Sequence, residues 1–143
     1  MKIQQIYEQY RILPMLAEQM YRVASVATMI ADNMTVEIDI EAITKAALLH
    51  DMGNILKFNL TLFPEAYADK GVEYWADVQK EYEQKYGSDE HTATVTIAKE
   101  IGVSERILEF INAYGFGKVL ERLDDQDYGN KISLYSDHRV APH

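Results

Sequence analysis

The sequence predicts an all-α fold, a compact single domain of about six helices spanning residues 1–143, on three observations. Apolar residues recur at three- and four-residue spacing, as in helices with one buried face. Most of the three prolines and seven glycines fall where such segments would begin or end. No Asn-Gly or Asp-Gly hairpin turn occurs, and the one alternating stretch, "MTVEIDI" (34–40), is isolated. With 48% apolar residues, the chain is long enough to bury a core.

The first two predicted helices lie in the N-terminal half of the chain. One runs from Pro14 to about Asn33, and its apolar face would consist of Met15, Leu16, Met20, Val23, Ala24, Ala27 and Ile30. Asp39 can cap the second helix, because a carboxylate at this position accepts a backbone N–H. We expect Gly53 to end this helix. Its buried stripe would consist of Ile43, Ala46, Ala47 and His50.

Four further helices are predicted in the C-terminal part, each bounded by a capping residue, a glycine or a proline. A polar, acidic stretch (121–130) precedes the last of them. The first comprises residues 71–86 and is ended by Gly87, and the second is capped by Ser88 or Asp89 and ended after Ile101 by Gly102. The third is the segment "ERILEFINAYG", capped by Ser104, and the fourth is "KISLYSDHRV" (131–140), before Pro142.

Composition excludes several classes of function. The net charge is 14 − 23 = −9 and no basic cluster is present, so we expect no duplex nucleic acid as a partner. The absence of cysteine excludes disulfides and thiol catalysis. Neither a signal peptide nor an apolar run of about 20 residues is evident, which predicts a cytoplasmic protein without membrane association. Oligomeric state is left open, a homodimer included.

The stretch "AALLHDMGN" (46–54) places two strong polar groups, His50 and Asp51, at the end of an apolar run. Neighbouring helical residues point about 100° apart, but both can reach an ion lying over the edge between them. One nitrogen and one carboxylate oxygen fill only part of a metal's coordination shell, so other helices must contribute ligands. The candidates are Asp137 in "LYSDHRV" and Gln19 in "AEQMYRVASVA".

These segments together resemble the HD superfamily of metal-dependent phosphohydrolases, over about residues 15–141. "LLHDMGN" is similar to the family's His-Asp doublet and "LYSDHRV" to its helix with a late Asp. "YRVASVA" is similar to the helix that carries the first His, three residues before its Arg. The resemblance implies a divalent metal (Mn, Ni, Zn, Fe or Mg) bound by His50, Asp51 and Asp137. It also implies hydrolysis of a small phosphate ester, a nucleotide being the expected class.

The sequence departs from the family at the first ligand, where Gln19 stands in place of His. A neutral amide oxygen is a poorer ligand for such a metal than an imidazole. The ion could be held weakly by the other three residues, or it could be absent. If this helix is aligned with the family one residue earlier, Glu18 rather than Gln19 would be the metal ligand. The alternative function is therefore a degenerate HD domain that binds a ligand or partner without catalysis.

Further roles follow for polar residues near the doublet and elsewhere in the chain. Asp51 is the expected catalytic residue, as a metal ligand that also orients the attacking water. Each remaining candidate has a structural alternative: a salt bridge for the cations, a surface position for the histidine. The substrate-binding candidates are Arg22, Asn54, His91, Arg139 and Lys57, with a small phosphate-containing ligand as the partner.

Overall fold

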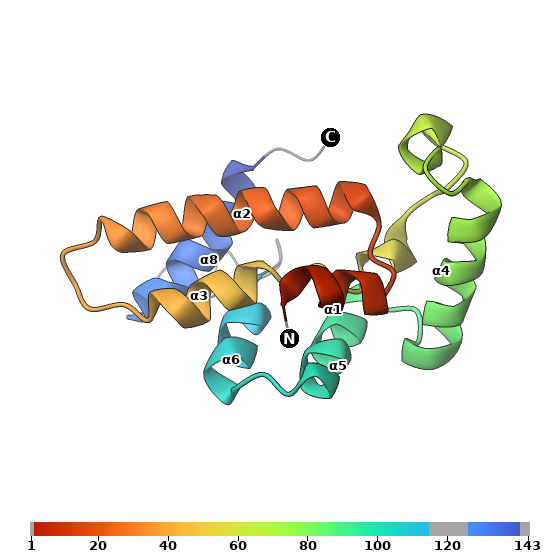
Figure 1. The fold of residues 1–143 in the computed structure, drawn as a ribbon. Coiled ribbons are helices and arrows are strands. Elements are labelled where there is room, and N and C mark those ends of the chain that lie inside the picture. Colours follow the sequence, from red (N-terminus) through yellow and green to blue (C-terminus); the bar gives the residue numbers. More distant parts are fainter. Residues whose placement is uncertain (1, 115–125, 141–143) are drawn as a thin grey trace.

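The computed structural model describes residues 2–114 and 126–140, and within these ranges every regular element is helical. The all-α prediction is confirmed: the described residues form seven α-helices and two 3-10 helices, whose arrangement Figure 1 shows. The α-helices are α1 (Ile3–Gln9), α2 (Pro14–Asp32), α3 (Ile40–Ala47), α4 (Val72–Tyr86), α5 (Glu90–Ile101), α6 (Glu105–Ala113) and α8 (Tyr128–Arg139). The 3-10 helices are η1 (Asn54–Lys57) and η2 (Pro64–Tyr67).

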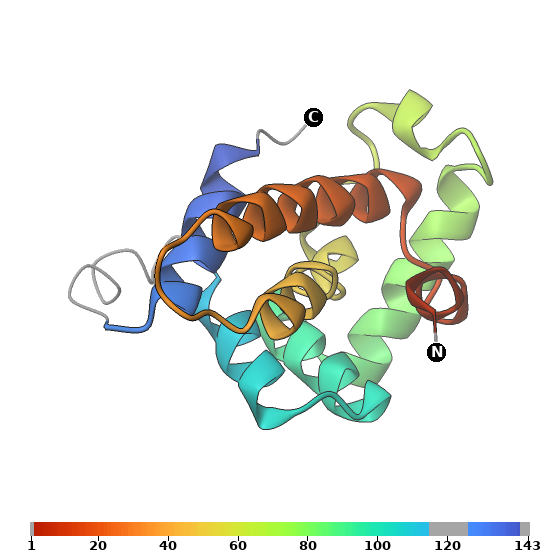
Figure 2. The ribbon, with the colours of Figure 1, turned by 60° about the vertical axis from the view of Figure 1, so that its left-hand side comes forward.

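The helices surround the segment that follows α3. The long helix α2 packs against α3 and α8, while α6 packs against the same two helices from below (Figure 1). On the other side, α4 and α5 both contact η1. Figure 2 shows the chain that leaves α3 in the middle of this arrangement. The turn that carries the His-Asp doublet therefore lies at the centre of the packed helices.

Local sequence signals account for most helix boundaries. The side chains of Asp39, Asp89 and Ser104 accept hydrogen bonds from backbone N–H groups in the first turns of α3, α5 and α6. Of the two candidate caps for α5, Asp89 is the one used. Gly87 and Gly102 end α4 and α5 with φ of 85° and 82°, a region that favours glycine.

The second predicted helix is shorter than expected, which corrects the placement of His50. Helix α3 ends at Ala47, and the following turns use three-residue hydrogen bonds, such as Leu49 N–H to Ala46 and Met52 N–H to Leu49. His50 thus lies in a turn rather than on the helical stripe. The periodic apolar pattern continues through these turns because Leu49 and Met52 are buried as well.

Gly53 does not end a helix; its φ is −92° and it precedes η1. A Cβ atom there would lie 2.4 Å from the Glu90 carbonyl oxygen and 2.7 Å from the Ala93 Cβ, so α5 packs directly on its backbone. The Gly53 N–H donates to Thr94 Oγ1 at 2.9 Å. Glycine is required at this position by close packing rather than by a helix end.

Near the two ends of the chain, the structure differs from the predicted helices in smaller ways. Helix α1 was not predicted, and it buries Ile6 and Tyr7, the latter donating from its hydroxyl to the Leu48 carbonyl oxygen at 2.6 Å. Helix α8 begins at Tyr128, before the predicted start. Residues 121–125 of the acidic stretch lie outside the described residues. No helix in the described ranges is long and apolar enough to span a membrane.

Replacing Thr94 by Val is expected to lower the free energy of unfolding by about 1–3 kcal/mol, because it leaves the buried Gly53 N–H without an acceptor. Thr96→Val is the matched control. Thr96 lies on the same helix and also donates to a carbonyl four residues earlier, but it is exposed. Measured by urea unfolding, the free energy of unfolding of the Thr96→Val control should differ from that of wild type by no more than about 0.5 kcal/mol. Equal losses in the two variants would contradict the role given to the Gly53 contact.

Candidate metal centre

His50 is held in a defined orientation in the turn that follows α3. Its side chain has no exposed surface. Nδ1 lies 2.7 Å from the carbonyl oxygen of Ala47, which can only accept, so this nitrogen carries a proton. Nε2 is consequently the atom that faces the rest of the site, as in metal-ligating histidines whose other nitrogen donates to a carbonyl.

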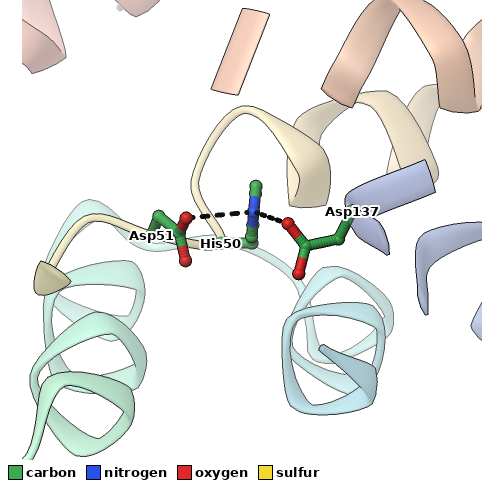
Figure 3. Close-up of side chains that lie close together, drawn as sticks. All are labelled: His50, Asp51 and Asp137. Carbon is green, nitrogen blue, oxygen red and sulfur yellow. Dashed lines mark hydrogen bonds and ion pairs between the residues drawn. The ribbon is translucent and has the colours of Figure 1, made fainter. Parts of the chain in front are cut away.

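Two carboxylates flank Nε2 of His50 on opposite sides (Figure 3). Asp51 Oδ2 lies 3.3 Å from Nε2, and Asp137 Oδ1 lies 3.2 Å from it. Asp137 is on α8, which contacts α3, so the packing of these helices joins residues 87 positions apart. Both carboxylates are largely covered, with 16% and 21% of their side-chain surface exposed. The predicted convergence of these three residues is therefore observed in the structure.

The electrostatics of the cluster are dominated by these close contacts. Burial lowers the pKa of His50, but Asp51 and Asp137 oppose it more strongly and raise that pKa to about 10. Burial likewise raises the pKa of Asp51, yet the imidazolium outweighs it and holds the pKa of this carboxyl below its usual range. The cluster thus favours a positive charge at Nε2, the atom through which a metal would also bind.

The donor set fits a divalent metal ion. One ligand atom from each of His50, Asp51 and Asp137 can be chosen so that all lie within 4.8 Å of one another. Ligands at about 2.0–2.2 Å from one ion lie roughly 3 Å apart, close to the separations around Nε2. One imidazole nitrogen and two carboxylate oxygens suit zinc, iron, nickel or manganese. These residues would hold the ion, leaving further coordination positions for water or substrate.

Gln19 is half-buried on α2, next to the fully buried Met20. Helix α2 packs against both α3 and α8, the helices that position His50 and Asp137. This is the helix on which the resemblance places the first metal ligand. A contribution of the Gln19 amide to the metal shell stays a prediction.

Two of the predicted substrate-binding residues lie beside Asp51. Asn54 is buried at the start of η1, and its side chain is among the groups that lower the pKa of Asp51. Lys57, at the end of η1, is exposed, and its positive charge acts on the same carboxylate. Gln79 of α4 donates to the carbonyl oxygens of Ile55 and Phe58, at 2.7 and 2.8 Å, and so fixes η1 in place.

The other three candidates have different surroundings. Arg22 forms an exposed ion pair with Glu18 on α2. His91 hydrogen-bonds through Nε2 to Asn112 on α6 at 3.0 Å, and Arg139 is exposed at the end of α8. Within the described ranges, none of them forms a hydrogen bond or ion pair with the three clustered residues. Their roles toward a substrate stay predictions.

Tyr114 is not among the predicted site residues, yet its ring stacks on His50 with centroids 4.2 Å apart and planes at 21°. Nothing in the local pattern marks it, since it lies among several aromatic residues and directly follows α6. Trp75, by contrast, is 2% exposed and belongs to the hydrophobic core.

The fold and the site together define a helical protein with a His-Asp-Asp cluster, and the sequence comparison agrees with this class. The family model of the HD domain matches residues 16–136, most of the chain. The chain therefore belongs to the HD domain family. No curated protein and no solved structure matched it significantly.

Addition of manganese, nickel or zinc should raise the unfolding temperature, because a ligand that binds only the folded state stabilises it. The expected gain is about 2.7 kcal/mol at a hundred times the dissociation constant. Asp137→Asn should remove most of this shift. Asp77→Asn, which changes an exposed acid on α4, should keep it. A metal-dependent shift of the same size in both variants would argue against the cluster as the binding site.

Proposed function

We propose that this protein is a metal-dependent phosphohydrolase that acts on a small phosphate ester, with a nucleotide as the expected class. The observation that carries the proposal is the convergence of His50 Nε2 with the Asp51 and Asp137 carboxylates in a chain of the HD domain family. The donor set supports a divalent ion, and the family is the one in which such an ion serves phosphate ester hydrolysis.

A bound divalent ion would polarise a phosphoryl oxygen and lower the pKa of a water ligand. The remaining roles fall to side chains of the protein. His50 is fully buried and serves only to bind, whereas part of the Asp51 carboxylate reaches the surface. We therefore assign to Asp51 the orientation of the attacking water through its second oxygen.

Binding of phosphate requires local positive charge in a protein of net charge −9. Lys57 is the best-supported cation, because its charge already acts on Asp51 and its side chain lies at the surface. Arg22 and Arg139 are further candidates. The exposed Arg22–Glu18 ion pair is weak enough, about 0.3–0.5 kcal/mol for a helical pair, to be exchanged for a phosphate.

Hydrolysis of a generic phosphate ester and of a panel of nucleoside monophosphates, with each divalent metal in turn, tests this proposal. Asp51→Asn is expected to reduce kcat by about 100-fold or more, since it removes a charged ligand and the group that orients water. Asp77→Asn again serves as the control for loss of one acidic charge. Metal binding without any turnover would favour the alternative of a binding domain.

Gln19→His should strengthen metal binding by at least ~10–100-fold, because an imidazole replaces a neutral amide beside an existing nitrogen and two carboxylates. Metal content after dialysis and calorimetric titration would measure this, and hydrolysis should rise with it. Glu18→His is the matched control at the neighbouring, exposed position. A gain with Glu18→His alone would mean that the register of this helix is shifted by one residue.

A further inference from the structure

Tyr114 occupies a specific place between α6 and the metal-binding cluster. Helix α6 ends at Ala113, and Tyr114 takes an extended conformation with φ −73° and ψ 154°. Its ring is 5% exposed and lies against the imidazole of His50, nearly parallel to it. Because α6 packs on both α3 and α8, this ring lies where α6 meets the turn after α3, which carries His50, and α8, which carries Asp137.

Two contacts together define the orientation of the imidazole. The hydrogen bond from Nδ1 to the Ala47 carbonyl oxygen fixes one atom of the ring, but leaves rotation about the N–H···O direction. Stacking on Tyr114 fixes the plane of the ring. With both contacts present, Nε2 can point only toward the two carboxylates.

The hydroxyl group of Tyr114 does not account for this position. Within the described residues, the buried phenol oxygen faces the buried Ser133 hydroxyl of α8, which acts to lower the pKa of the phenol, and it forms no hydrogen bond with His50. Burial raises the pKa of Tyr114 above its usual range, so the phenol stays neutral. The aromatic face is thus the part of Tyr114 that contributes.

We infer that Tyr114 is a positioning residue of the metal centre: its aromatic ring holds the His50 imidazole in the plane that directs Nε2 between Asp51 and Asp137. The effect on metal affinity rests on the proposed function, whereas the ordering of the imidazole does not. The hydroxyl contributes nothing to this role, so phenylalanine should replace tyrosine without loss.

The test compares Tyr114→Phe with Tyr114→Leu and Tyr114→Met, after circular dichroism has established that each is folded. Tyr128→Leu, at an exposed tyrosine on α8, is the control for loss of an aromatic ring. In the metal-free protein, NMR reports the His50 ring C–H protons, assigned among the four histidines by their loss in His50→Gln. Titration with manganese or zinc then gives the affinity of each variant.

In wild type and Tyr114→Phe, the His50 ring protons should be shifted upfield by the stacked ring, and the two affinities should be equal. In Tyr114→Leu and Tyr114→Met, the upfield shift should be lost and metal binding should weaken by about 10–100-fold. Absence of the upfield shift in wild type overturns the inference, even if neither aliphatic variant folds. Loss of affinity in Tyr114→Phe also overturns it, because the hydroxyl would then be required.

The NMR arm separates this inference from the proposed function. If wild type binds no metal but the ring shifts follow the expected pattern, the metal site fails while the positioning role stands. If metal binds with equal affinity in wild type and both aliphatic variants, the positioning role fails while the metal site stands.

Discussion

The buried ion pair between His50 and the carboxylates of Asp51 and Asp137 is the interaction on which the site depends. It joins the turn after α3 to α8, so it forms only when α3 and α8 pack together. A charged imidazole without exposed surface is tolerated because two carboxylates compensate it. Removal of one partner of a buried pair typically costs about 3–5 kcal/mol, so the cluster constrains the fold as well as the chemistry.

The surroundings of the cluster are arranged to keep it rigid. Ala47 and Tyr114 orient the imidazole, while Thr94 and Gln79 hold the segment from Gly53 to η1 against α5 and α4. Rigid support matters for a metal centre, because ligands that are already in place lose little entropy when the ion binds. In the proposed site it would matter more, because Gln19 in place of a histidine would leave the affinity to the three residues of the cluster.

Charge explains how an acidic chain can act on an anionic ligand. In the metal-free state, the imidazolium offsets only one of the two negative charges of the carboxylates, whereas a divalent ion beside a neutral imidazole would offset both. The positive charge of the exposed Lys57 also acts on Asp51. A small phosphate ester therefore needs only a local excess of positive charge, which the overall composition of the chain does not reveal.

By itself, the sequence determined the helical class, most helix boundaries and the three residues of the cluster, because periodicity, capping residues and the ordered His-Asp and Asp segments are local signals. It did not determine that α3 ends at Ala47, since Leu49 and Met52 continue the apolar pattern through a turn that only packing defines. Gly53 was assigned to a helix end, whereas contact with α5 requires it. Tyr114 could not be found at all: its stacking on His50 joins residues far apart in the chain, and only the packing of α6 against α3 brings them together.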